Sequence, residues 1–252
     1  MMTLVDRDRF FSMAETFDKM AQRLVPKYDF LQDELFNIID FSNASSINVV
    51  DLGAGSGIML EKILNRYPNS KCYWVDYSNQ FLDVAKNRLS KYGDRVDFIL
   101  SSFEDSWEDE VHGKIHLIVS MSAIHHLESR EKKDLYKRIY SILEPNGWFF
   151  NIDEMKTLYS EAYKNSMIFW ADYVNQNRIN IPENQMAYYD NWNKYFDKWK
   201  KRNIENINTQ KKKGDDLHEG FVNQLSWLEN IGFKSVDLFI KYHLWCVIGG
   251  QK

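Results

Sequence analysis

The chain has 252 residues, of which 44% are hydrophobic and 27% charged. These proportions are ordinary for a globular protein, and the length suits one large domain or one domain with an insertion. The formal net charge of −4 disfavours a polyanionic partner, so we expect no nucleic acid to bind. No stretch approaches the roughly 20 apolar residues of a membrane span, and the first residues do not read as a secretion signal. We therefore expect a cytoplasmic protein without a membrane partner.

The two cysteines, Cys72 and Cys246, lie in separate apolar, strand-like stretches. They do not have the spacing of a metal pair. We expect buried free thiols in a reducing compartment.

Residues 8–40 are predicted to be helical, with an interruption at Pro26. From there to residue 154, short apolar strands alternate with amphipathic helices. The strands are expected at 45–53, 71–78, 96–102, 116–122 and 148–154, and the helices at 58–67, 79–93 and 129–143. This alternation indicates βαβ units, and near-continuous apolar strands indicate a parallel sheet covered on both faces.

The composition changes between residues 155 and 215, where the chain is polar and aromatic with no strand signal. We expect helices here, including the stretch 208–216. The aromatic side chains of this insertion include Trp170, Tyr173, Tyr188, Tyr189, Trp192, Tyr195 and Trp199. A helix ended by Gly232 and two strands close enough to form a hairpin complete the chain.

The segment VVDLGAGSG at 49–57 ends a predicted strand with closely spaced glycines, which favours a nucleotide-binding turn. Ile58 stands where the dinucleotide fingerprint requires its last glycine, and no P-loop lysine is present. Asp51 would repel a pyrophosphate but would accept hydrogen bonds from a cationic amino-acid group. A ligand with adenosine, an ammonium and no phosphate fits, namely S-adenosylmethionine.

Four successive motifs, VVDLGAGSG, YWVDYS, IVSMSAIHHL and LEPNGWFF, resemble those of class I S-adenosylmethionine-dependent methyltransferases. The resemblance covers about residues 40–155 and extends to the closing hairpin. It implies an α/β, Rossmann-like seven-stranded sheet of order 3-2-1-4-5-7-6, with strand 7 antiparallel and helices on both faces. It also implies one domain over 1–252, with an N-terminal helical lid at 1–40 and a substrate-covering helical insertion at 155–215.

The resemblance implies cofactor-binding roles for residues that end the first two strands. Asp51, Gly53 and Gly55 would contact the methionine half of the cofactor. Asp76 would accept hydrogen bonds from both ribose hydroxyls, because a carboxylate matches a cis-diol. Tyr77 would pack on the adenine or lie at the surface.

The third strand departs from the family pattern at its end, where Ser102 replaces the usual acid that binds the adenine amine. Amine recognition is then weaker, or it is shared with Glu104 or Asp105. Phe103 would stack on the adenine ring.

Two further side chains are expected beside the cofactor. Ser120 ends the fourth strand and would line the ribose and sulfonium region. Tyr28, in the N-terminal lid, would reach over the cofactor.

The candidate catalytic residues are His125 and Glu154. His125 would act as a general base near the transferred methyl group or would shape the pocket wall. Glu154 and its neighbour Asp153 would bind a cationic substrate, act as a base, or remain solvated at the strand end. His126 is a candidate substrate contact, and because neither histidine has a partner at metal-ligand spacing, we expect no metal.

The aromatic insertion offers Trp170, Tyr173 and Trp192 as substrate contacts, which suits an apolar, planar or cationic small molecule. The expected reaction is in-line S_N2 transfer of the methyl group to N, O or C, promoted mainly by alignment and lid closure. The alternatives are a tRNA-modifying or carboxy-S-adenosylmethionine-forming enzyme, or a non-catalytic cofactor-binding module. Homodimerisation through the insertion is a further possibility.

Overall fold

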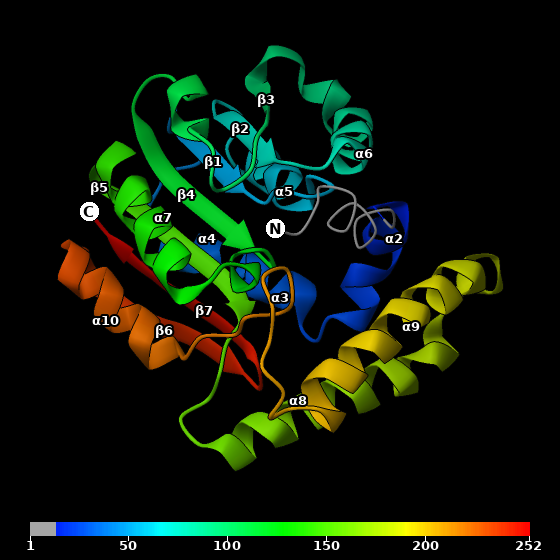
Figure 1. Cartoon of the computed structure of the whole chain (residues 1–252). Helices are drawn as coiled ribbons and strands as arrows, with labels where there is room; N and C mark the ends of the chain where they lie inside the picture. Colours follow the sequence, from blue (N-terminus) through cyan, green and yellow to red (C-terminus); the bar gives the residue numbers. More distant parts are fainter. Residues whose placement is uncertain (1–13) are drawn as a thin grey trace.

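The computed structural model describes residues 14–252, so the first part of the predicted N-terminal lid lies outside the described residues. Seven strands form one sheet in the order β3-β2-β1-β4-β5-β7-β6, as the family resemblance implies (Figure 1). The strands are β1 (Asn48–Leu52), β2 (Lys71–Asp76), β3 (Val96–Leu100), β4 (Ile115–Met121), β5 (Leu143–Glu154), β6 (Lys234–Tyr242) and β7 (Trp245–Gln251). The first five strands are parallel, and β7 runs antiparallel to both β5 and β6.

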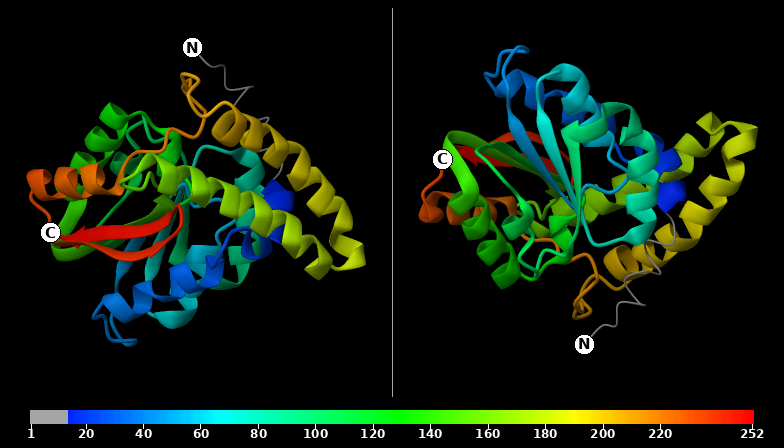
Figure 2. Two further views of the ribbon diagram at one scale, coloured as in Figure 1. Left: turned by 90° about the horizontal axis from the view of Figure 1, so that it is seen from below. Right: turned by 90° about the horizontal axis from the view of Figure 1, so that it is seen from above.

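Helices cover both faces of the sheet (Figure 2). The α-helices are α2 (Ala14–Leu24), α3 (Tyr28–Asp33), α4 (Leu35–Ile38), α5 (Ile58–Arg66), α6 (Asn79–Leu89), α7 (Ser129–Ile142), α8 (Ser160–Asn177), α9 (Met186–Lys200) and α10 (Phe221–Ile231). Shorter helical segments are η1 (Ser90–Arg95), η2 (Trp107–Glu110), η3 (Ile124–His126), η4 (Arg178–Asn180), η5 (Glu183–Gln185) and η6 (Lys201–Glu205).

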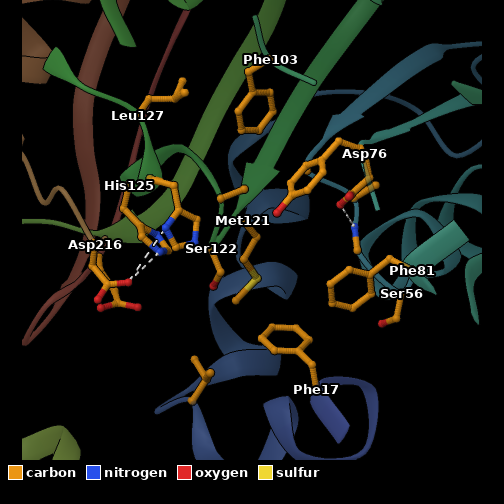
Figure 3. A pocket seen from close by; sticks show the side chains of 18 of the residues that line it. Phe17, Ser56, Asp76, Phe81, Phe103, Met121, Ser122, His125, Leu127 and Asp216 are labelled. Atoms are coloured by element: carbon orange, nitrogen blue, oxygen red, sulfur yellow. Dashed lines mark hydrogen bonds and ion pairs between the residues drawn. The ribbon is translucent and has the colours of Figure 1, made fainter. Parts of the chain in front are cut away.

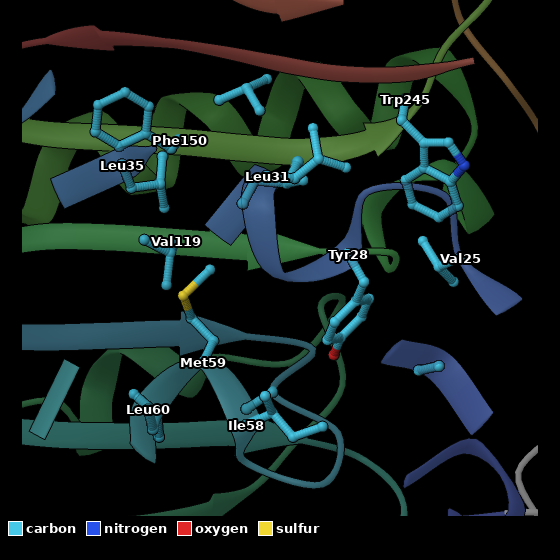
Figure 4. Close-up of a cluster of buried hydrophobic side chains, with 14 of the residues drawn as sticks. Val25, Tyr28, Leu31, Leu35, Ile58, Met59, Leu60, Val119, Phe150 and Trp245 are labelled. Atoms are coloured by element: carbon cyan, nitrogen blue, oxygen red, sulfur yellow. The ribbon is translucent and has the colours of Figure 1, made fainter. Parts of the chain in front are cut away.

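The alternation of side chains along each strand separates two hydrophobic cores. Val49 and Leu117 belong to the core that α3, α4, α5 and α6 cover, whereas Val50 and Ile118 face α7 and α10. Successive side chains of a strand point to opposite faces, so each buried strand contributes to both cores. Figure 4 shows part of the first core, in which Leu35 lies near Phe150 and Val119 of the sheet.

Helices α8 and α9 form a cap beyond the carboxyl ends of the parallel strands, beside α2 (Figure 1). Trp170 of α8 donates a hydrogen bond to the carbonyl oxygen of Leu24 at 2.8 Å, and Asn191 of α9 donates one to Thr16 at 3.1 Å. The insertion and the N-terminal helix are therefore joined in one structure, which we call the cap.

Two local predictions are wrong. The stretch 208–216 is a loop and not a helix, because a run of three lysines followed by Gly214 at φ 93° offers no apolar face. The strand expected at 148–154 begins earlier, at Leu143, through an irregular stretch whose pairing with β4 shifts register and where Asn146 has φ 67°.

The buried thiols of Cys72 and Cys246 are free, as predicted. Among residues 14–252, no helix combines the length and apolar character needed to cross a membrane.

Candidate active site

A cavity of about 350 Å³ lies at the carboxyl ends of β1 to β5 and beneath the cap (Figure 3). This is the edge at which open parallel sheets bind ligands. Its floor comes from the strand ends and the glycine turn, and its roof includes Phe17, Trp170 and Trp192. The cavity has a glycine-and-acid end near Asp76 and a histidine-and-acid end near His125.

The glycine turn packs closely against a neighbouring side chain at one position and leaves room at another. A Cβ on Gly53, which has φ 70°, would lie 2.4 Å from the Cβ of Ala123. A Cβ on Gly55, at φ 51°, would meet nothing nearer than the ring of Phe81 at 3.8 Å. Gly53 is thus needed for packing, whereas Gly55 leaves its backbone accessible from the cavity, which it lines.

Asp76 at the end of β2 holds the same turn in place. Its Oδ2 accepts a hydrogen bond from the Gly55 N–H and its Oδ1 accepts one from the Ser78 N–H, each at 2.9 Å. Burial raises the pKa of Asp76 to about 6, although these backbone donors oppose the rise. The carboxylate lines the cavity and retains lone pairs for further donors.

Asp51 is buried at the end of β1 and lines the same end of the cavity. Its Oδ2 has no hydrogen-bond partner in the described structure. Burial, followed by the charge of Asp76, raises the pKa of Asp51 to about 8. A buried acceptor without a donor favours a ligand that brings a donor or a positive charge.

The residues expected around the adenine and the methyl group also reach the cavity. Those that line it are Tyr28, Tyr77, Ser102, Phe103, His125, His126, Glu154, Trp170 and Trp192. Ser102 donates a hydrogen bond to Asp105 at 2.8 Å, so the serine that replaces the family's acid is itself attached to an acid.

Two predicted site residues do not line the cavity. Ser120 is buried in the sheet, where its hydroxyl donates to the carbonyl oxygen of Leu52 at 2.7 Å, and Met121 takes the cavity position instead. Tyr173 lies on α8 one helical turn from Phe169 and packs near it at 6.1 Å between ring centroids, away from Trp170, which faces inward.

At the other end of the cavity, His125 forms an ion pair with Asp153. The histidine Nδ1 lies 2.6 Å from the aspartate Oδ1, and both side chains are buried. Burial lowers the pKa of His125, but the neighbouring carboxylates, Asp153 first among them, outweigh it and raise that pKa to about 9. Burial raises the pKa of Asp153, but the charge and the hydrogen bond of His125 outweigh this effect. The pKa of Asp153 therefore lies below its ordinary value. The carboxylates around His125 thus favour positive charge at its ring.

Glu154 is supported from behind by two residues that the sequence did not assign to the site. Its Oε2 lies 3.0 Å from Nε2 of His218 without the geometry of a hydrogen bond, and His218 Nδ1 lies 2.7 Å from the hydroxyl of Tyr163. Burial raises the pKa of Glu154 to about 8. This carboxyl group lines the cavity, so it is accessible to a bound substrate.

Asp216 completes the histidine-and-acid end and was also missed. It is buried and lies on the loop before α10, and its Oδ2 accepts hydrogen bonds from Arg202 at 3.2 Å and Asn203 at 2.9 Å. The adjacent acids at 215–216 and the nearby His218 were the available signal, but they stand in a polar stretch that reads as solvated loop.

Comparison with known proteins agrees with this geometry. The family model described as a methyltransferase domain matches residues 49–147. The carboxy-S-adenosyl-L-methionine synthase of Nautilia profundicola is 22% identical over 231 residues, which are 92% of this chain and 88% of that protein. Malonyl-[acyl-carrier protein] O-methyltransferase 2 of Ilyobacter polytropus is 32% identical over 140 residues, 55% of this chain and 49% of that protein.

Among solved structures, an O-methyltransferase family protein from Burkholderia thailandensis has the same fold. The TM-score is 0.61 at 15% identity, over 98% of this chain and 59% of that one. The chain thus spans less than two thirds of that neighbour and about half of the malonyl-[acyl-carrier protein] methyltransferase.

The sheet order, the glycine turn with its two acids and the methyltransferase-domain match over residues 49–147 support a class I S-adenosylmethionine-dependent methyltransferase. Its cofactor is S-adenosylmethionine, and the residues present fit it. The Asp51 acceptor lacks a donor, the Gly55 backbone is open to the cavity, and Asp76 offers lone pairs to hydroxyl groups.

Proposed function

We propose that this enzyme transfers a methyl group to a small-molecule nucleophile bound at the histidine-and-acid end of the cavity. The observation that carries the proposal is that a single cavity runs from Asp76 to His125 and Glu154. When bound, the cofactor supplies an electrophilic sulfonium methyl group. Asp51, Gly55 and Asp76 would orient the cofactor, while Tyr28, Tyr77, Ser102 and Phe103 would enclose its nucleoside.

The charge of the cavity lining favours a neutral or cationic acceptor. Six acids line the cavity, against one lysine and one arginine, Lys198 and Arg202. Arg202 is already paired with Asp215 at 3.4 Å and with Asp216 at 3.2 Å. His125 is likewise paired with Asp153, which leaves Lys198 to offset the repulsion that the acids of the lining would exert on an anionic acceptor.

Glu154 is the residue that we assign to receive a hydrogen bond or a proton from the acceptor. It ends β5 at the cavity wall, and His218 and Tyr163 stand behind it. Positioning of this kind contributes through alignment of the reacting atoms.

The cap supports the aromatic contacts proposed for the acceptor. Trp192 stacks on Phe17 at 5.8 Å between ring centroids, and Trp170 packs edge-on against Trp199 at 4.6 Å. The indole N–H groups of Trp192 and Trp199 have no hydrogen-bond partner among residues 14–252, and both residues line the cavity. They would donate to polar atoms of the acceptor, and closure of the cap would exclude water.

Formation of carboxy-S-adenosylmethionine is the second candidate. This candidate is supported by the length of the match. The synthase relative aligns with 92% of this chain, whereas the malonyl-[acyl-carrier protein] methyltransferase aligns with 55%. The excess of acids in the lining disfavours a carboxylate beside the sulfonium.

The test is release of S-adenosylhomocysteine from S-adenosylmethionine in the presence of amine, phenol, thiol and carbon-acid panels. We expect acceptor-dependent release that Glu154→Gln lowers at least about 10-fold, with S-adenosylhomocysteine binding retained. Mass spectrometry of the nucleoside products, with a decarboxylatable acid added in parallel reactions as carboxyl donor, separates the candidates. A carboxylated cofactor without S-adenosylhomocysteine release would favour the second. Cofactor binding with neither product would contradict both.

A further inference from the structure

His125, His126 and Asp216 form a three-residue group at one end of the cavity. Each offers one ligand atom, and these three atoms lie within 4.8 Å of one another. Asp216 Oδ1 lies 3.7 Å from His125 Nε2 and 4.0 Å from His126 Nδ1. These distances exceed a hydrogen bond. Two ligands of one ion, each about 2.0–2.2 Å from it, lie roughly 3–3.6 Å apart, so a small contraction would close the group around a cation.

The backbone brings these side chains together from distant parts of the sequence. The histidines occupy the short η3 turn after β4, and their rings lie 4.0 Å apart between centroids. The N–H of Leu217 donates to the carbonyl oxygen of His125 at 2.8 Å, so the residue after Asp216 is attached to the turn. In Figure 3, Asp216 and His125 face each other at the cavity wall.

Surrounding groups orient each donor atom toward the same point. Asp153 binds Nδ1 of His125 at 2.6 Å, which directs Nε2 toward Asp216. Arg202 and Asn203 hold Oδ2 of Asp216, which leaves Oδ1 toward the histidines. A histidine backed by a carboxylate and a ligand carboxylate held by hydrogen bonds are the usual supports of a metal centre.

The donor set and its exposure to the cavity identify the class of ion. Two imidazoles and one carboxylate suit a divalent first-row transition metal such as Zn²⁺, Fe²⁺ or Co²⁺, whereas Mg²⁺ and Ca²⁺ prefer oxygen ligands. All three side chains line the cavity. A three-ligand site beside a cavity leaves a coordination position for a substrate or water, as catalytic sites do.

We propose that His125, His126 and Asp216 bind one divalent transition-metal ion, with Asp153 as the supporting carboxylate. The prediction of no metal considered spacing along the chain, and the third donor comes from a separate loop. A second step rests on the proposed function. The bound ion would hold the acceptor's nucleophilic atom at its free coordination position and would favour the deprotonated form of that atom. Binding of the ion itself does not depend on that function.

The experiment begins with the purified chain after chelator treatment and dialysis. It is titrated with Zn²⁺ against a chromophoric chelator and, separately, with Co²⁺, whose visible absorption reports coordination. We expect one ion per chain. His126→Gln and Asp216→Asn should each weaken Zn²⁺ binding at least 100-fold, and Asp153→Asn 10- to 100-fold. His112→Gln removes an exposed histidine elsewhere and should leave binding unchanged.

Titration with S-adenosylhomocysteine shows whether each variant has kept its fold. Equal Zn²⁺ binding by wild type, His126→Gln and Asp216→Asn would overturn the proposal, and so would Co²⁺ without visible absorption. His126→Gln keeps the test decisive if Asp216→Asn does not fold. Tight Zn²⁺ binding without methyl transfer to any acceptor would uphold the metal site and count against the proposed function alone.

Discussion

The indole Nε1 of Trp170 donates a hydrogen bond to the carbonyl oxygen of Leu24, 146 positions earlier in the chain, at 2.8 Å. Leu24 ends α2, so its carbonyl is one of the last four of the helix, which have no partner within it. The same indole packs edge-on against Trp245 of β7 at 5.5 Å between ring centroids. One side chain therefore joins the insertion, the N-terminal helix and the sheet.

Replacing Trp170 should loosen the cap in two steps. Trp170→Phe keeps a ring but leaves the Leu24 carbonyl unpaired, so we expect the free energy of unfolding to fall by about 1–2 kcal/mol. Trp170→Ala also leaves a cavity and should cost about 3–5 kcal/mol. Denaturant unfolding measures both. Trp227→Phe on α10, a partly buried tryptophan outside the cap, is the control, and an equal loss there would contradict the role of the bond.

Alanine at the two glycines should have different main effects, on stability at Gly53 and on cofactor binding at Gly55. Gly53→Ala would place its Cβ 2.4 Å from Ala123, so we expect loss of stability by about 1–3 kcal/mol. The methyl group of Gly55→Ala has room in the free protein. The positive φ at this position should lower the free energy of unfolding by about 1 kcal/mol. The added methyl group would interfere with close approach of the cofactor to the backbone. Calorimetric titration should therefore show S-adenosylmethionine binding weakened at least 10-fold in a folded Gly55→Ala protein, and unchanged affinity would refute this assignment.

Cofactor binding should release a proton from Asp51. Burial raises the pKa of this carboxyl group to about 8, so at pH 7 the free protein holds it mostly protonated. A cationic ligand group beside it favours the ionised form and lowers its pKa. The apparent binding enthalpy at pH 7 should then vary with the ionisation enthalpy of the buffer. Asp51→Asn has no proton to release, and a persistent buffer dependence in that variant would assign the proton to another group.

The same carboxyl group should make the free protein less stable as the pH rises. Its pKa is about 8 when folded and near 3.8 when unfolded, so between these values the folded state holds a proton that the unfolded chain has lost. Stability is then lost with rising pH, at up to about 1.4 kcal/mol per pH unit for this one group. Without cofactor, Asp51→Asn should be more stable than wild type at pH 8 and should lose that advantage near pH 4. Thermal unfolding across this range tests it, and a pH-independent difference would be inconsistent.

Asp76→Asn should weaken the cofactor site without removing the side chain's volume. The two carboxylate oxygens accept from the Gly55 and Ser78 N–H groups, and an asparagine would turn its NH₂ toward one of these donors. It also offers a neutral acceptor where the carboxylate would receive hydroxyl groups. We expect S-adenosylmethionine affinity to fall by about 10- to 100-fold, as one lost charge-assisted interaction implies. Titration calorimetry measures this affinity. Asp83→Asn, on the exposed surface of α6, is the matched control.

Much of the glycine-and-acid end was predictable because its residues follow directly from strand ends. A parallel strand places the residue after it at the same edge as its neighbours, so Asp51 and Asp76 had to come together once the strands were recognised. The prediction that Ser120 lines the cavity is wrong for a related reason. Adjacent strand residues face opposite sides, and the prediction placed Ser120 at the cavity, whereas its neighbour Met121 reaches it.

The amino-acid sequence by itself determined the strand-and-helix order and the glycine turn, because both depend on local periodicity and spacing. Its motifs, through their resemblance to a known family, implied the order of the sheet and supported the cofactor. The tertiary structure decided the histidine-and-acid end. Asp216 and His218 belong to a polar loop whose sequence has no periodicity, and only the folded chain brings that loop to His125 and Glu154. Tyr173 and Trp170 differ in the same way, since both are aromatic residues of one helix and packing alone selected which of them lines the cavity.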